Sequence, residues 1–142
     1  MVYIIGAGPG DPELITVKGQ RLLKEADVII YAGSLVNPAL LDYAKADCEI
    51  YNSASMTLGE VIETITAAEQ EGKMTVRLHT GDPAIYGAIQ EQMDELSRRN
   101  IEYTVIPGVS SFLATAAALK QEYTLPEISQ TVIITRNEGR TP

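Results

Sequence analysis

The sequence predicts a three-layer α/β/α fold in which helices cover both faces of a mostly parallel, five-stranded sheet. Short runs rich in β-branched residues alternate with amphipathic helical segments over most of the chain. Glycine or proline follows several of these runs, as is typical where a strand turns into a helix. The chain of 142 residues, 45% of them hydrophobic, has the size of one domain with a sizeable core.

The first half of the chain contains three of the expected strands. They are expected at 2–5, 27–31 and 48–51. A helix is predicted to begin directly after Asp11, which is placed as an N-cap before Pro12. The apolar face of this helix is expected to consist of Ile15, Gly19, Leu22, Leu23 and Ala26. A weaker helical segment is expected at 38–44.

The second half continues the alternation with clearer helix ends. Thr57 and Glu60 have the spacing of a capping box, and Gly72 offers a left-handed stop, which together delimit a helix. The remaining strands are expected at 74–78 and 103–106, with a final small-residue helix at 112–118. Ser110 is placed as the cap of that last helix.

A further helix is predicted to begin at Asp82, followed by Pro83 at its first position, and to end near Asn100. Its apolar stripe is expected to consist of Ile85, Ile89, Met93 and Leu96.

Ligands of such parallel sheets bind beyond the carboxyl ends of the strands. The loops expected at that edge are 6–11, 32–37, 79–85 and 107–111. The first of them resembles a dinucleotide-binding loop, but Asp11 stands where the third glycine is needed, and its carboxylate would repel a pyrophosphate. The glycines therefore indicate either close approach of a ligand to the backbone or a tight turn.

The two later loops carry polar groups that suit a small molecule. Asp82 adds a carboxylate to the amides of a helix start, which favours a polar or zwitterionic ligand, although helix capping alone would also explain it. Ser110 and Ser111 could hold a carboxylate or amide edge, or Ser110 could simply be a cap. Neither serine has a recognisable triad partner, so nucleophilic catalysis is rejected and no catalytic residue is assigned.

Composition excludes several classes of function. A net charge of −8 disfavours nucleic acid and anionic membranes as partners. The apolar runs are too short to cross a bilayer, which favours a soluble, unsecreted protein. Cys48 and His79 have no neighbours at metal-ligand spacing, so no metal site is expected and both side chains are interpreted as structural.

Three segments in order carry a family resemblance. Gly6–Asp11 with Leu14–Gly19, then Thr80–Pro83, then Pro107–Ser111, resemble the tetrapyrrole (corrin/porphyrin) methylases over essentially the whole chain. The resemblance implies S-adenosylmethionine as cofactor and a tetrapyrrole as substrate. The residues implied to line the cofactor pocket are Pro9, Thr80, Gly81, Asp82, Ile85, Ser110 and Ser111, and those implied to face the substrate are Asp11 and Ser34.

Within the family, three further segments resemble the branch that methylates C11 of precorrin-4 or of cobalt-precorrin-4 in cobalamin synthesis. These segments are 31–36, 52–58 and 76–87. Ala32 stands where the uroporphyrinogen methylases carry an aspartate. The alternatives are a family member that acts on uroporphyrinogen, ribosomal RNA or a diphthamide precursor, a nicotinamide-binding oxidoreductase domain, and a chain that binds nothing.

The resemblance also implies a cytoplasmic homodimer and a domain boundary. Residues 1–128 correspond to the family's N-terminal domain, and 129–142 to the first strand and linker of a second domain. Because the family binds its cofactor between the two domains, the chain alone is expected to be inactive. The β-prone run 131–135 is expected to pair with a second copy or to be poorly ordered. Basic groups for the substrate would come from Arg77, Arg136, Arg140 or the second domain.

Overall fold

The computed structural model describes residues 1–136 and divides the chain into two compact units, 1–111 and 112–142. The first unit contains the sheet and three of the α-helices. Within the predicted terminal segment 129–142, residues 137–142, including Arg140, lie outside the described part of the chain.

The sheet has five strands in the order β3-β2-β4-β1-β5, and all of its neighbours pair in parallel. The strands are β1 (Val2–Gly6), β2 (Val28–Tyr31), β3 (Glu49–Asn52), β4 (Thr75–His79) and β5 (Tyr103–Ile106). Every residue of β4 is buried, whereas every residue of the edge strand β3 is exposed. The predicted five-stranded sheet is confirmed.

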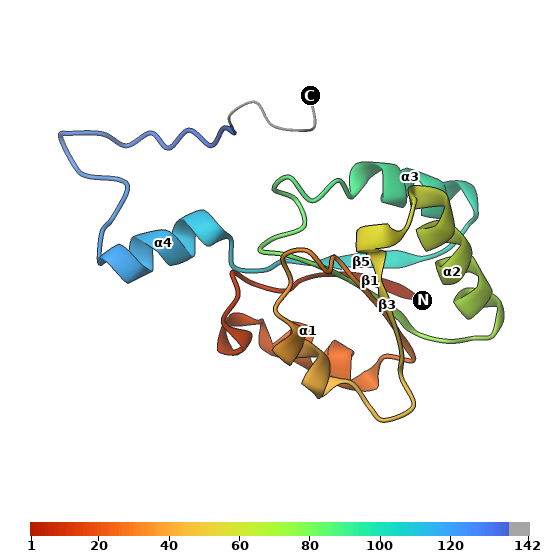
Figure 1. Cartoon of the computed structure of the whole chain (residues 1–142). Helices are drawn as coiled ribbons and strands as arrows, with labels where there is room; N and C mark the ends of the chain where they lie inside the picture. The colour runs from red at the N-terminus through yellow and green to blue at the C-terminus, as the bar shows by residue number, and fades with distance from the viewer. Residues whose placement is uncertain (137–142) are drawn as a thin grey trace. The chain divides into compact units, whose positions relative to one another are not determined.

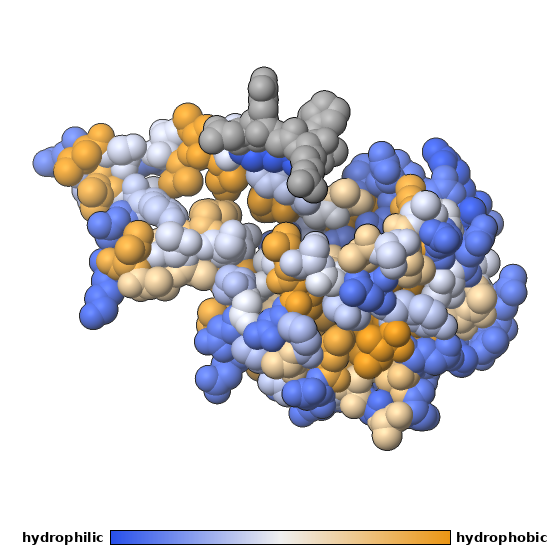
Figure 2. Space-filling view, viewed as in Figure 1, coloured by the Kyte–Doolittle hydropathy of each residue, from blue (hydrophilic) through white to orange (hydrophobic). Residues whose placement is uncertain are grey.

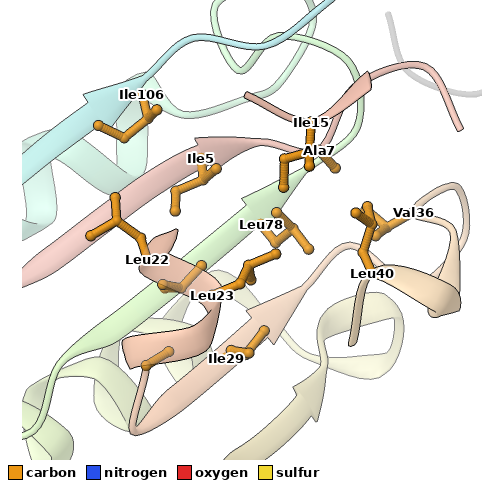
Figure 3. Packing of buried hydrophobic residues seen from close by; sticks show 12 residues of the cluster. Ile5, Ala7, Ile15, Leu22, Leu23, Ile29, Val36, Leu40, Leu78 and Ile106 are labelled. Atoms are coloured by element: carbon orange, nitrogen blue, oxygen red, sulfur yellow. The ribbon is translucent and has the colours of Figure 1, made fainter. Parts of the chain in front are cut away.

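Helices cover both faces of this sheet (Figure 1). They are α1 (Val17–Glu25), α2 (Leu58–Gln70) and α3 (Gln90–Arg98). Short 3-10 segments at Pro12–Leu14, Pro38–Tyr43 and Ser53–Ser55 lie in the connections between strands and helices. Successive residues of β2 point to opposite faces. Ile29 lies in one cluster with Leu23 of α1 (Figure 3), while Ile30 lies in another with Ile62 of α2. The expected three-layer α/β/α arrangement is therefore confirmed.

The central strands β1 and β4 are followed by helices that lie on opposite faces of the sheet. The chain leaves β1 toward α1 and leaves β4 toward α3 (Figure 1). Adjacent strands whose connections diverge in this way form a topological switch point, where doubly wound sheets bind their ligands. The loops after β1 and β4 thus flank the expected ligand-binding crevice.

The capping box predicted for α2 is present. Thr57 Oγ1 accepts a hydrogen bond from Glu60 N at 3.3 Å, and Thr57 N donates to Glu60 Oε2 at 2.7 Å. Gly72, with a φ of +70°, follows the helix in the left-handed region, as predicted.

The predicted start of α1 is wrong by several residues. Asp11 caps only the single turn Pro12–Leu14, and the backbone is extended at Ile15 and Thr16. This extended stretch places Ile15 in the core beneath the sheet, and Thr16 then caps α1 through a 3.0 Å hydrogen bond from Gly19 N.

The predicted start of α3 is also wrong. Tyr86 and Ala88 have φ values of +55° and +50°, which an α-helix of L-residues does not accommodate. The helix therefore begins only at Gln90, and Ile85 is 41% exposed instead of lying on its buried stripe. Asn100, at a φ of +54°, follows the helix end where it was expected.

The last helix, α4 (Ser111–Leu119), confirms the predicted small-residue helix. The rest of the second unit is described only as far as residue 136. Residues 131–136 form no regular strand, and Ile128 and Ile133 are 79% and 83% exposed. Figure 2 shows hydrophobic residues, in orange, on the surface of the segment after α4.

Candidate functional site

The loops after β1 and β4 are joined backbone to backbone. Ala7 N donates to His79 O at 2.6 Å, directly beyond the parallel pairing of the two strands. Gly8 and Gly81 then exchange two hydrogen bonds, of 3.2 Å from Gly8 N and 2.8 Å from Gly81 N. This short antiparallel contact fixes the two sides of the switch point to each other.

Three glycines allow the loop after β5 to pack against the same contact. A Cβ on Gly108 would lie 2.2 Å from Gly81 O, and a Cβ on Gly6 would lie 2.5 Å from the same oxygen. No side chain fits at such distances from backbone atoms. Gly6 is thus required by loop packing, whereas Gly10, at a φ of +125°, has open space around the Cβ position.

Asp82 links two of the loops through both of its carboxylate oxygens. Oδ1 accepts a hydrogen bond from Ala84 N at 2.8 Å, and Oδ2 accepts one from Gly108 N at 2.9 Å. The sequence predicted a helix cap here, but Asp82 caps a turn and holds the neighbouring loop.

The structure brings together the residues predicted for the cofactor pocket. Pro9 follows the Gly8–Gly81 contact, and the Cβ position of Gly81 lies 3.7 Å from Ser110 Cα and 3.9 Å from Ser111 N. Pro9, Thr80, Gly81, Asp82, Ser110 and Ser111 therefore all lie on these three adjoining loops. Ile85 follows on the same loop as Asp82, with its amide donating to Asp82 O at 3.2 Å and its side chain 41% exposed.

The two residues predicted to face the substrate lie on loops that a third residue connects. Asp11 and Ser34 are both exposed, and Asp11 Oδ1 accepts a hydrogen bond from Glu13 N at 2.9 Å. Asn37 Nδ2 donates to Gly10 O at 2.7 Å, which joins the loop of Ser34 to that of Asp11. Sequence reasoning missed Asn37, although an asparagine before a proline is a common turn signal.

Arg77 lies beneath the loops, on the face of β4 that α3 covers, and is 7% exposed. Its Nε donates to Gln92 Oε1 and its Nη1 to Ile30 O, both at 3.1 Å. Burial lowers the pKa of the guanidinium to about 10. The expectation that Arg77 could supply a basic group to the substrate is wrong, because its side chain is committed to internal acceptors.

His79 is the second buried basic residue of β4 and is 5% exposed. Burial, and secondarily the charge of Arg77, lower the pKa of the imidazole to about 3. Its Nε2 atom has no hydrogen-bond partner within the described residues. His79 is therefore a neutral residue of the interior at physiological pH.

The loops offer backbone amides, carbonyl groups and short hydroxyls, a set suited to holding a polar small molecule by position. Within residues 1–136, no cluster of three or more histidine, cysteine or acidic side chains could hold a metal ion. In the same part of the chain, no helix has the length and apolar character needed to cross a membrane.

Comparison with known proteins identifies the family of the chain. The model of the tetrapyrrole (corrin/porphyrin) methylases matches residues 1–142. A cobalt-precorrin-4 C(11)-methyltransferase from Methanocaldococcus jannaschii is 66% identical over 99% of this chain and 54% of its own length. The chain thus spans about half the length of the curated relatives it matches.

Two solved structures extend this comparison. The X-ray structure of a cobalt precorrin-4 methyltransferase is 55% identical, with a TM-score of 0.96 over 99% of this chain and 59% of the other. A uroporphyrin-III C-methyl transferase from Thermus thermophilus, solved in complex with S-adenosyl homocysteine, is 38% identical. It matches with a TM-score of 0.70 over 81% of this chain and 47% of the other.

Proposed function

Because the chain belongs to the tetrapyrrole (corrin/porphyrin) methylase family, we propose that it is part of a methyltransferase of cobalamin synthesis. The reaction is transfer of a methyl group from S-adenosylmethionine to C11 of precorrin-4 or cobalt-precorrin-4. The observation that carries the proposal is the 66% identity to an enzyme of that name over 99% of the chain. Since the chain spans only 54% of that relative, we expect the 142 residues alone to be inactive.

The three adjoining loops fit the proposed cofactor. Gly8 and Gly10 have positive φ values, and the open space at Gly10 lets a ligand approach the backbone. The residues that would hold S-adenosylmethionine are Pro9, Thr80, Gly81, Asp82, Ile85, Ser110 and Ser111. A relative that is 38% identical was solved with S-adenosyl homocysteine, the product form of this cofactor.

S-adenosylmethionine supplies an activated methyl group, whose transfer turns its sulfonium cation into a neutral thioether. The task of the protein is mainly to place the donor and the acceptor carbon in line. The backbone-linked loops around Gly8, Gly81 and Gly108 suit that task, because their positions are fixed before a ligand arrives.

The acceptor is proposed to lie outside the three loops, against Asp11 and Ser34. Both side chains are exposed, and the Asn37–Gly10 hydrogen bond holds their loops together. The carboxylates of a tetrapyrrole need cationic partners. Since Arg77 is buried, we assign that role to a region beyond the described residues or to Arg136.

We further propose that the working enzyme is a cytoplasmic homodimer whose first domain comprises residues 1–128. The exposed apolar run 131–135 belongs, in this proposal, to the following domain and promotes self-association of the isolated chain. Sedimentation velocity should show less association for a chain that ends at Glu127, with its cooperative unfolding retained. Loss of cooperative unfolding would place the run inside the first domain.

A chimera tests the proposed reaction. Residues 1–142 are joined to the remainder of the Methanocaldococcus jannaschii relative and incubated with methyl-labelled S-adenosylmethionine and a panel of acceptors. The panel contains precorrin-4, cobalt-precorrin-4, uroporphyrinogen III, ribosomal RNA and a diphthamide precursor. We expect label only in the first two. Label in uroporphyrinogen or RNA, with none in precorrin-4, would overturn the proposal.

A further inference from the structure

The loop between β4 and α3, residues 83–89, has a conformation that its own sequence does not favour. Tyr86 and Ala88 occupy the left-handed region, at φ values of +55° and +50°. A Cβ on the intervening Gly87 would lie 2.1 Å from Pro83 O. Side chains other than glycine rarely adopt this region unless surrounding structure enforces it. Something outside the loop must therefore hold it.

A chain of buried hydrogen bonds reaches the loop from the sheet. Arg77 on β4 donates from Nη1 to Ile30 O of β2 and from Nε to Gln92 Oε1 of α3, both at 3.1 Å. Gln92 in turn donates from Nε2 to Ala88 O, also at 3.1 Å. The carbonyl group of the second left-handed residue is thus connected to two strands of the sheet.

The side chains that form this series of hydrogen bonds are buried, unlike those of hydrogen bonds on the surface. Arg77 and Gln92 are 7% and 6% exposed. No carboxylate among residues 1–136 forms an ion pair with the Arg77 guanidinium, so its buried charge depends on neutral acceptors. Burying a cation without an anionic partner costs desolvation free energy. Apolar side chains at this place would avoid that cost.

The 83–89 loop, which these hydrogen bonds reach, borders the candidate site. It follows Asp82 directly, and its Ile85 amide donates to Asp82 O at 3.2 Å. Ile85 and Tyr86 are 41% and 59% exposed. A shallow cavity of about 290 Å³ lies along the loop, with Pro83, Gly87 and Met93 in its lining.

We propose that Arg77 and Gln92 are positioning residues, whose buried hydrogen-bond chain fixes the 83–89 loop before the methyl donor binds. This inference rests on the proposed function only for the identity of the ligand. Through Gln92, these hydrogen bonds constrain Ala88. They thereby constrain the segment that presents Ile85 to the proposed cofactor site. The free energy of ordering the loop is then met in folding, so a ligand does not have to supply it.

Gln92→Glu separates positioning from structural support. The carboxylate still accepts from Arg77 Nε, as an ion pair, but has no N–H to donate to Ala88 O. We expect thermal stability to be retained, while amide hydrogen exchange within 83–90 rises about fivefold to tenfold, the effect of one lost hydrogen bond. Gln92→Met, which removes both bonds, should accelerate the same exchange and also lower the melting temperature.

Gln90→Glu is the matched control, because Gln90 is exposed on the same helix and bonds only to Asp94. Unchanged exchange within 83–90 in Gln92→Glu would overturn the proposal. Exchange that rises equally over the whole domain would overturn it as well, since Gln92 would then support the fold alone.

Titration with S-adenosylhomocysteine adds an independent readout. We expect its affinity to fall in Gln92→Glu, by up to the same factor, and to stay unchanged in Gln90→Glu. If exchange responds as expected but the unmodified chain binds no S-adenosylhomocysteine, the positioning role stands and the proposed cofactor site fails. Affinity that is unchanged in Gln92→Glu despite faster exchange would show that the loop does not serve the donor site.

Discussion

Two segments of this chain each carry a local signal for a helix start, a capping box at Thr57 and a cap followed by proline at Asp82, and only the first is followed directly by a helix. At Thr57 the capping box is complete, and α2 follows at once. At Asp82, followed by Pro83, the carboxylate caps a turn, and seven residues intervene before α3 begins at Gln90. The α2 start serves packing against the sheet, whereas the Asp82 segment lies at the switch point.

The difference lies in what else each capping side chain contacts. Among the described residues, the side chains of Thr57 and Glu60 hydrogen-bond only within the capping box, to each other and to each other's backbone amides. Asp82 also holds Gly108, in a loop 26 residues further along the chain. Local rules fail first where a segment must satisfy a distant partner, and such places are often functional sites.

The largest effect is expected from filling the contact between the loops. Gly108→Ala would place a methyl group 2.2 Å from Gly81 O, and backbone atoms there have little freedom to move. We expect a loss of about 3 kcal/mol in the free energy of unfolding, measured by urea denaturation. Gly59→Ala in α2 is the control, since its Cβ would meet only Thr57 Oγ1 at 3.8 Å, and it should stabilise by about 0.5 kcal/mol. If the two substitutions changed the free energy of unfolding equally, this would contradict the close packing of the loops at Gly108.

The second effect concerns pH and His79, the one histidine of the sequence. Its folded pKa of about 3 lies below the ordinary value of 6.5, so the unfolded state binds the proton first. Stability should therefore fall with pH between 6.5 and 3, with a loss of about 2 kcal/mol from pH 7 to pH 5. Denaturation at both pH values should show this loss in the parent chain and not in His79→Gln. Parallel losses in the two proteins would indicate that another group is responsible.

The third effect compares the two caps directly. Thr57→Ala and Asp82→Ala should each cost about 1 kcal/mol of stability, because each removes hydrogen bonds to backbone amides. Only Asp82→Ala should also weaken binding of S-adenosylhomocysteine, measured by calorimetry, since Asp82 positions both its own loop and Gly108. If Asp82→Ala changed stability alone, the segment would be no more than a turn.

The alternation of apolar runs was sufficient to predict the five strands and the three layers, because burial on a parallel sheet leaves a strong local pattern. The glycine motifs also placed the three loops at one edge. The starts of α1 and α3 were mispredicted, since the extended backbone at Ile15 and the left-handed residue Ala88 depend on tertiary contacts. The hydrogen bond from Arg77 to Ile30 and the hydrogen bond from Asn37 to Gly10 also connect residues that are distant in sequence. No local sequence pattern predicts such contacts.

The most direct test of the account is an NMR titration of the isotope-labelled chain with S-adenosylhomocysteine, followed by NAD. We expect weak, saturable shifts confined to the amides of 6–11, 79–85 and 107–111, because the chain spans only 54% of the length of the Methanocaldococcus jannaschii relative. The α2 start around Thr57 serves as the internal reference and should not shift. Shifts of these loops with NAD but not with S-adenosylhomocysteine, or no shifts in them at millimolar ligand, would contradict the assignment of the glycine-linked loops as the methyl-donor site.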